Sequence, residues 1–193
     1  MVTIAIRSKA RADEALLVER ARQGDRDSFE ALVDARLART FRIALAILGN
    51  EADARDATQD TFVRVWRDLA GLRDADRFDQ WFGRILVNTC RSAVRGRGRR
   101  WVRELPVTAM PDGGAGFDPP AEPQDLRSWD DDMVSRALDR VSVAERTILV
   151  LRYYEDLSLA EIAGQLGIPA KTAKSRLFTA RRALERAVEG ERR

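Results

Sequence analysis

The sequence predicts an all-α protein made of two small helical domains joined by a flexible linker. Apolar residues recur at helical spacing in both halves of the chain, and we find no segment whose alternation demands a strand. Between about Trp101 and Arg127 this periodicity stops and proline and glycine accumulate, as in an extended tether. We therefore expect an N-terminal tail with a short helix over residues 1–24, a first domain over 25–100, the linker over 101–127 and a second domain over 128–193.

The first long helix is expected from Asp27 to Leu48, after a short helix from Ala12 to Gln23. Asp27 followed by Glu30 has the spacing of a capping box at the start of the long helix. Gly49-Asn50 would supply left-handed residues at its end.

Two further helices of the first domain each combine an apolar side with a charged side. In the segment Glu51 to Leu69, Phe62 and Trp66 follow the buried spacing, so we expect both in the core rather than at an interface. The segment Phe78 to Arg95 has a similar apolar side and ends in a basic edge. Cys90 lies off its main apolar stripe, and we expect a free structural thiol there.

The strongest local pattern lies in the second domain and is typical of a helix-turn-helix. Four short helical pieces are expected there, two of them with capping boxes at Ser142 to Glu145 and Ser158 to Glu161. Gly167 makes the turn, and Pro169 suits the first turn of the basic helix that follows it.

The basic helix from Ala170 to Val188 would bury a narrow stripe that includes Ala173 and Ala180 and would turn its polar residues outward. An α-helix fits the DNA major groove, and its N-terminal half is the part that usually reaches base edges. Arginine, lysine, serine and threonine are the residue types that donate to bases and phosphates. We expect DNA contacts from Lys171, Thr172, Lys174, Ser175, Arg176, Phe178, Thr179 and Arg182.

Charge is distributed unevenly along the chain. The formal net charge is only +3, yet arginine is concentrated from Arg91 to Arg103 and basic residues again from Lys171 to Arg193, while Asp125 to Asp132 is acidic. Two basic patches on a nearly neutral protein indicate localised contact with a polyanion.

Composition excludes several classes of site. Histidine is absent and Cys90 is the only cysteine, so the chain alone offers no disulfide framework, no zinc site and no histidine-based triad. We expect no cofactor. Residues Met1 to Arg20 lack the apolar core of a signal peptide, and no segment approaches the roughly 20 apolar residues of a membrane helix, so we expect a cytoplasmic protein.

Three segments resemble, in order, conserved regions of the sigma-70 family of RNA polymerase sigma factors. Asp53 to Trp66 resembles region 2.2, Phe78 to Arg100 resembles regions 2.3 and 2.4, and Tyr153 to Leu184 resembles region 4.2. The linker stands where larger members carry region 3. The short length and this missing region point to the extracytoplasmic-function (ECF) group of the family.

The resemblance implies a non-enzymatic subunit that binds core polymerase, promoter DNA and a regulatory anti-sigma factor. Region 2.2 grips a coiled coil of the largest polymerase subunit in that family, which implies core contacts from Asp53, Asp56, Gln59, Asp60, Arg64 and Arg67. Regions 2.3 and 2.4 melt and read the minus-10 element, which implies DNA contacts from Trp81, Arg84, Asn88, Arg91, Arg95, Arg99 and Arg100. Region 4.2 reads the minus-35 element in that family, which implies that the outward residues of the basic helix contact minus-35 DNA.

Two details of the minus-10 surface come from the residues themselves. The loop Gly71 to Gln80, with Asn88, is the candidate pocket for an unstacked base, which amide and aromatic groups can hold. Trp81 lies at the border of the apolar and basic sides, so the sequence favours core packing and DNA contact equally for its side chain.

The chain departs from the family pattern at three places. Arg55 stands where an acidic residue is usual, Ser92 replaces a frequent aspartate, and Lys171-Thr172-Ala173 differs from the common Gly-Thr-Val. These changes leave the family resemblance intact, but they mean that the promoter sequence recognised by other members cannot be assigned to this chain.

Three alternatives belong to other classes. A different helix-turn-helix regulator would need a dimerisation or ligand-sensing domain, and an enzyme with a DNA-binding tail would need a catalytic domain, usually with strands. A pure interaction protein with basic helices would lack sequence-specific DNA binding.

Overall fold

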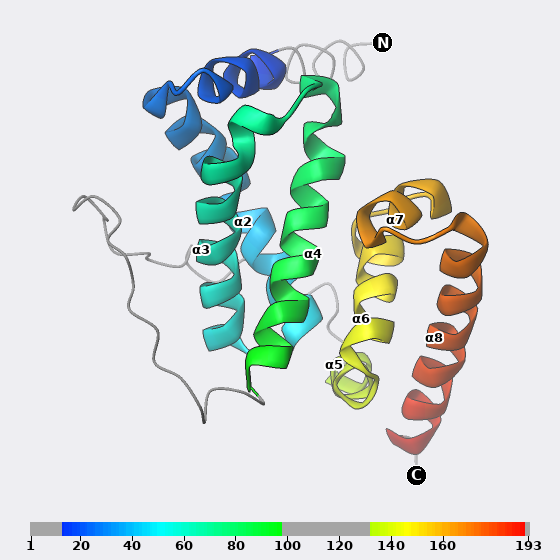
Figure 1. Cartoon of the computed structure of the whole chain (residues 1–193). Helices are drawn as coiled ribbons and strands as arrows, with labels where there is room; N and C mark the ends of the chain where they lie inside the picture. Colours follow the sequence, from blue (N-terminus) through cyan, green and yellow to red (C-terminus); the bar gives the residue numbers. More distant parts are fainter. Residues whose placement is uncertain (1–12, 98–131, 192–193) are drawn as a thin grey trace, which may run out of the picture.

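The computed structural model describes residues 13–97 and 132–191, and within these ranges it contains helices and no strands. A helix over residues 13–22 precedes α2 (Arg26–Leu48), α3 (Glu51–Asp68) and α4 (Phe78–Arg97), with short 3-10 turns η1 (Leu69–Gly71) and η2 (Ala75–Arg77) between the last two. The second part consists of α5 (Asp132–Arg140), α6 (Val143–Leu149), the π-helical turn η4 (Val150–Tyr154), α7 (Leu159–Leu166) and α8 (Ala170–Glu191) (Figure 1). The predicted all-α class is confirmed.

The helix over 13–22 and α2 to α4 form the first bundle. Figure 1 shows α2, α3 and α4 side by side, with the N-terminal helix lying across one end. At that end, Val18, Leu32, Phe62, Phe78 and Phe82 belong to one buried cluster. A second cluster, built around Phe41, Ile47, Ala57, Leu86 and Cys90, fills the other end.

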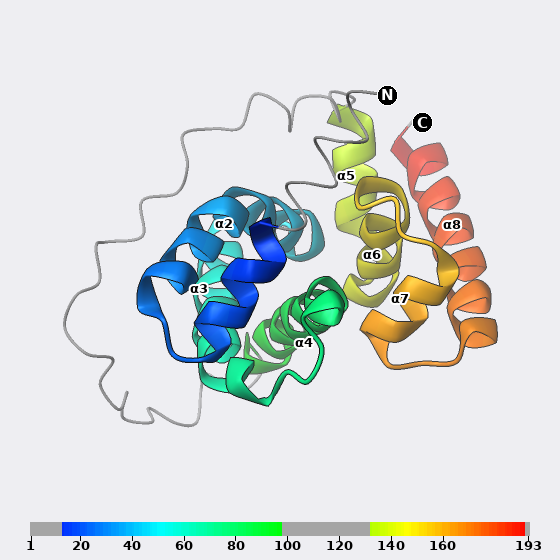
Figure 2. The same cartoon turned by 90° about the horizontal axis from the view of Figure 1, so that it is seen from above.

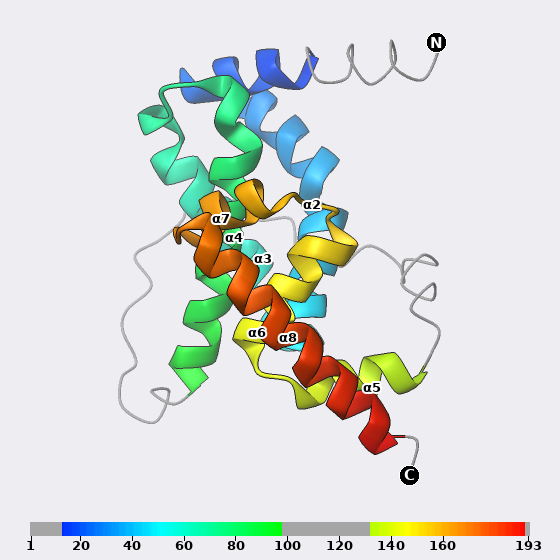
Figure 3. The ribbon, with the colours of Figure 1, turned by 90° about the vertical axis from the view of Figure 1, so that its right-hand side faces the viewer.

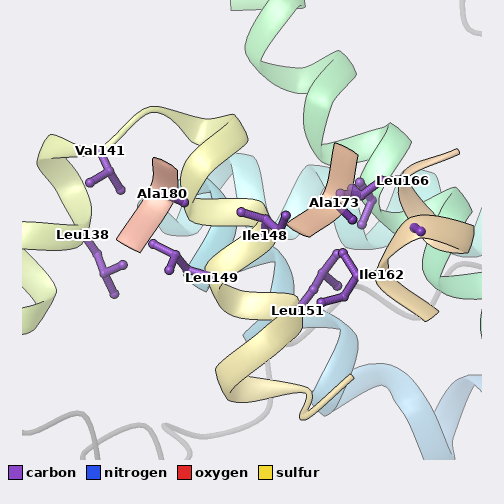
Figure 4. Close-up of a cluster of buried hydrophobic side chains, with 11 residues drawn as sticks. Leu138, Val141, Ile148, Leu149, Leu151, Ile162, Leu166, Ala173 and Ala180 are labelled. Carbon is purple, nitrogen blue, oxygen red and sulfur yellow. The ribbon is translucent and has the colours of Figure 1, made fainter. Parts of the chain in front are cut away.

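Helices α5 to α8 form the second bundle, which packs around α6. Ile148, Leu149 and Leu151 from α6 and η4 meet Ile162 of α7 and the alanines Ala173 and Ala180 of α8 (Figure 4). Both alanines have no exposed surface. Their small size lets α8 lie close to α6, as the sequence pattern predicts for the buried side of a recognition helix.

The start of the first long helix differs from the prediction. Asp25, not Asp27, is the N-cap of α2, because its extended backbone lets the carboxylate accept hydrogen bonds from the backbone N–H groups of Asp27 and Ser28. At the other end Gly49 is left-handed, with φ 73°, as predicted. Asn50 is not left-handed: its φ is −146°, and it caps α3 by accepting from the N–H of Asp53.

The two capping boxes of the second bundle are confirmed. Ser142 and Glu145 bond each other's backbone N–H at the start of α6, and Ser158 and Glu161 do the same at the start of α7. Gly167 ends α7 in the left-handed region, with φ 65°, and so forms the turn of the helix-turn-helix.

The two bundles also pack against each other, which the sequence pattern did not predict. Helix α4 lies along α7, and α2 contacts α6 (Figures 2 and 3). None of the helices in the described ranges is both long and apolar enough to span a membrane.

Candidate polymerase and nucleic-acid surfaces

The outer face of α3 carries most of the residues that the family resemblance assigns to core polymerase. Asp56, Gln59, Asp60 and Arg67 are exposed, whereas Asp53 and Arg64 are half-buried. Asp53 also has a local role, because its carboxylate accepts a 2.9 Å hydrogen bond from the amide of its cap Asn50.

An apolar patch lies on this same face, and the sequence prediction missed it. Val63 is 36% exposed and Trp66 is 37% exposed, so Trp66 is not the core residue that its spacing predicted. Its indole packs on Phe29 of α2, with ring centroids 4.8 Å apart and the ring planes tilted by 49°, and part of it faces solvent. Phe62 is buried, as predicted. Val63 is one turn from Gln59 and Asp60, and that spacing could have revealed the patch.

The basic edge of α4 bears the residues assigned to the minus-10 element. Arg84, Asn88 and Arg95 are exposed, Arg91 is half-buried, and Arg99 and Arg100 lie outside the described residues. Burial lowers the pKa of Arg91, and the nearby positive charges of Arg176 and Arg95 lower it further. The positive charge of Arg176, on α8, therefore acts on Arg91 at the basic edge of α4.

Trp81, which the sequence left between packing and DNA contact, is half-buried. Its ring centroid lies 6.0 Å from that of Phe78, and it packs against the buried cluster at the N-terminal end of α4. Part of the ring therefore serves packing, while the rest is exposed.

Helix α8 presents its polar residues to solvent. Lys171, Lys174, Ser175, Arg176, Thr179 and Arg182 are exposed, and Thr172 is half-buried. Phe178 is 63% exposed, and the guanidinium of Arg182 lies 6.0 Å from its ring centroid. A large aromatic ring held at the surface of a basic helix can contact base methyl groups or sugars.

A cavity of about 640 Å³ lies between the N-terminal helix, the start of α4 and α7. Arg36 lines it and is held in place by Glu14, at 2.6 Å, by Asp79 and by the ring of Phe78, whose centroid is 4.9 Å away. The charge of Arg36 is therefore already paired with two carboxylates of this wall. No group of histidine, cysteine, aspartate and glutamate suited to a metal ion occurs among the residues that the structure describes.

Comparisons with known proteins agree with this arrangement. Residues 32–100 match the family Sigma-70 region 2, and residues 131–184 match the family Sigma-70, region 4. The RNA polymerase sigma-H factor of Pseudomonas aeruginosa is 30% identical over 179 residues, which cover 90% of this chain and 92% of the relative. The ECF RNA polymerase sigma-E factor of Haemophilus influenzae is 29% identical over 181 residues, 90% of this chain and 94% of that protein.

Two solved structures share the fold at low sequence identity. CnrH, in complex with the cytosolic domain of CnrY, has a TM-score of 0.65 at 24% identity and covers 92% of this chain and 98% of its own. The sigma factor RpoE, in complex with the anti-sigma factor NepR from Bartonella quintana, has a TM-score of 0.61 at 22% identity, with 83% and 96% covered. Together, the two matched regions and the full-length relatives show that the chain belongs to the sigma-70 family of RNA polymerase sigma factors and, within it, to the ECF group.

Proposed function

We propose that the protein binds core RNA polymerase through the outer face of α3 and directs it to promoters that α4 and α8 read together. The observation that carries this proposal is that one chain presents an exposed charged and apolar face on α3 and a helix-turn-helix with an outward reading side on α8. Binding both promoter elements with two tethered surfaces reinforces two modest contacts.

The core-binding surface consists of an apolar centre with charges around it. Val63 and Trp66 form the centre, the acidic residues Asp56 and Asp60 lie toward the N-terminal end of α3, and Arg67 lies toward the other end. Desolvated aromatic side chains carry most of the affinity in such interfaces, whereas rim charges set association rate and register. We therefore add Val63 and Trp66 to the polar core-binding residues expected from the sequence.

The minus-10 surface is the basic edge of α4. Arg84, Arg91 and Arg95 follow the DNA backbone, while Asn88 and the loop before α4 hold an unstacked base. Arg99 and Arg100 extend this surface in the proposal, on the strength of the sequence alone.

The minus-35 surface is the outward side of α8. Lys171, Lys174, Ser175 and Arg176 lie in its N-terminal half, where a recognition helix reaches base edges. Thr172 lies in the same N-terminal half, and Phe178, Thr179 and Arg182 continue this side toward the C-terminus.

The protein supplies no bond-making chemistry in this proposal, since the polymerase forms the phosphodiester bond. A regulatory anti-sigma factor that clamps both bundles is part of the proposal, supported by the anti-sigma partner in the RpoE complex. If neither bundle binds any anti-sigma candidate encoded beside it, this regulation is wrong.

The test is in vitro transcription with purified core polymerase and fragmented genomic DNA. The wild-type chain should yield discrete transcripts that start downstream of a shared two-part element. Asp56→Ala with Asp60→Ala should weaken initiation by slowing core association, and Lys174→Ala with Arg176→Ala should reduce it through lost minus-35 contacts.

The two variants also serve as controls for each other. The α3 variant should keep DNA affinity, and the α8 variant should keep core affinity, because the altered residues lie on different bundles. DNA binding without any core-dependent initiation by the wild type would contradict the proposal and favour an ordinary helix-turn-helix regulator.

A further inference from the structure

The loop Gly71 to Gln80 between α3 and α4 is held at two points. Leu72, which follows η1, and Phe78, which begins α4, are buried. Ala75 is half-buried, and every other residue of the loop is exposed. A segment with so few buried contacts opens at a low cost in free energy. The conformation of the loop therefore depends on what holds Leu72 and Phe78.

The N-terminal helix, residues 13–22, holds the first of these points. It lies across the end of the bundle where the loop runs (Figure 1). Arg22 Nη1 donates a 3.1 Å hydrogen bond to the backbone carbonyl of Leu72, and Glu19 orients Arg22 by accepting from its Nη2 at 2.7 Å. Val18 and Ala21 belong to the same buried cluster as the side chain of Leu72. Both the backbone and the side chain of Leu72 are thus fixed by one helix.

Arg36 of α2 links the same helix to the second point. Its Nε donates to Glu14 of the N-terminal helix at 2.6 Å, and its Nη2 donates to Asp79 in the first turn of α4. The guanidinium also lies over two rings of α4, 4.9 Å from the centroid of Phe78 and 5.3 Å from that of Phe82. The Arg36 side chain is only 18% exposed, and charge-assisted hydrogen bonds are stronger where water is scarce.

The spacing of the two links suits the N-terminal helix to hold both points at once. Glu14 and Arg22 lie eight residues apart, which is about 12 Å along a helix at 1.5 Å per residue. A helix is stiff over this length, so it fixes the two attachments relative to each other. None of its residues belongs to the surfaces proposed above for core polymerase or DNA.

The loop needs this support if it is to hold a base. Recognition of an extruded base requires hydrogen-bonding groups held within about 0.5 Å of their place. A loop that is still mobile must be ordered when the base enters, and this ordering reduces the affinity. A loop already fixed at Leu72 and Phe78 avoids that loss.

We propose that the N-terminal helix positions the candidate base pocket, through Arg22 at Leu72 and through Glu14 and Arg36 at the start of α4. These three are positioning residues, since they act through the loop and touch no DNA. The inference rests on the proposed function for the identity of the ligand, whereas the support of the loop rests on the contacts alone.

The test cuts one link at a time in the full chain. Arg22→Met removes the donor to Leu72 but keeps the apolar length of the side chain, and Glu14→Ala removes an acceptor of Arg36. Each variant is assembled with core polymerase and titrated with a single-stranded oligonucleotide that carries the minus-10 element found by the transcription experiment. We expect each to lose about fivefold in affinity, and the double variant about 25-fold, because the links hold separate points.

Two variants on the same helix are the controls. Arg20→Met changes an exposed arginine in the same way and should bind the oligonucleotide like the wild type. Glu14→Gln keeps an oxygen that can accept from Arg36, so it should retain most of the affinity that Glu14→Ala loses.

A second DNA separates positioning from general damage to the fold. A duplex that carries only the minus-35 element is read by α8, so Arg22→Met and Glu14→Ala should bind it with unchanged affinity. Equal losses on both DNAs would overturn the positioning role. Unchanged affinity of both variants for the single strand would overturn it as well.

Hydrogen exchange of the free chain tests the support of the loop without DNA. The backbone N–H of Leu72 donates to the carbonyl of Leu69, and that of Arg77 donates to the carbonyl of Asp74, so both report on the loop. Arg22→Met should speed exchange at Leu72 by at least about fivefold and leave α8 unchanged. Exchange like that of the wild type throughout the loop would overturn the inference.

Failure of the proposed function would look different. A wild-type chain that, with core polymerase, neither initiates nor binds the single strand would refute that function. The exchange rates would then decide by themselves whether the N-terminal helix holds the loop.

Discussion

Cys90 shows how a single position depends on its surroundings. Although it lies off the main apolar stripe of its helix, it is the free structural thiol that the sequence predicts, and it has no exposed surface. It packs with Phe41, Ala57, Leu86 and Val150, because α4 is covered by α2 and α3 and also by the second bundle. Burial raises the pKa of the thiol to about 12, so it stays protonated and unreactive at neutral pH.

We predict that Cys90 resists iodoacetamide in the native protein near pH 8 and reacts once urea unfolds the chain, as mass spectrometry would report. The folded pKa of about 12 lies above the model-compound value of 9.0, so the neutral thiol favours the folded state. The free energy of unfolding should be unaffected by this group below pH 9 and should fall as pH rises from 9 toward 12. Cys90→Ala should lack this part of the alkaline decline; rapid labelling of the native chain would contradict the burial.

Trp66 is the second residue whose role depends on exposure. We predict that Trp66→Ala weakens binding to core polymerase by about 2 kcal/mol, the loss typical of a central aromatic contact. Fluorescence anisotropy of the labelled chain with purified core measures this. Val63→Ala, which keeps both rings of the Phe29–Trp66 pair, should weaken binding less but in the same direction. If both variants bind core like the wild type, the apolar patch is not part of the interface.

Among the elements, α7 is short and depends strongly on its ends. It has only 8 residues, and it is framed by the Ser158–Glu161 capping box and the left-handed Gly167. The side chain of Glu161 accepts from both the backbone N–H and the hydroxyl of Ser158, at 2.8 and 2.6 Å. These bonds lower the pKa of Glu161, so the box is present at neutral pH. The helix-turn-helix therefore owes its geometry largely to local chemistry.

We predict that Ser158→Ala lowers the free energy of unfolding by about 1 kcal/mol, because the first N–H groups of α7 lose their acceptor. Urea titration followed by circular dichroism measures the change. Ser175→Ala, an exposed serine within α8, is the control and should stay within about 0.5 kcal/mol of the wild type. Equal stability of the two variants would mean that the cap is dispensable.

At the scale of the whole molecule, two basic surfaces lie on different bundles of one chain. The edge of α4 and the outward side of α8 carry separate sets of cations, and the positive charge of Arg176 on α8 helps to lower the pKa of Arg91 on α4. Each cation that neutralises a phosphate releases counterions, so salt dependence reports how many are engaged. The number should differ between DNA that carries one element and DNA that carries both.

We predict that the logarithm of the DNA association constant of the core-bound protein falls more steeply with the logarithm of salt on a two-element promoter than on a fragment with either element alone. Lys174→Ala should reduce that slope by about 0.9 on minus-35 DNA and leave it unchanged on minus-10 DNA. Filter binding over a salt series measures the slopes. A uniform change on both fragments would contradict the division of the two elements between the bundles.

The sequence by itself determined the features that depend on near neighbours along the chain. The helical period, the capping boxes at Ser142 and Ser158, the glycine turns and the alanine side of α8 all arise from residues within about one turn of each other. The family regions followed from the same local patterns. Even the error at Asp27 was a local one, since Asp25, two residues earlier, offers the same carboxylate.

Only the tertiary structure decided which helix faces meet across the molecule. Trp66 follows a buried spacing yet stays 37% exposed, because no element within residues 13–97 and 132–191 covers that side of α3, whereas Val150 is fully buried because the other bundle covers it. The fit of Gln165 over Gly83 joins positions more than 80 residues apart. No helical period encodes such a contact, because burial depends on where the rest of the chain lies and not on the spacing within one helix.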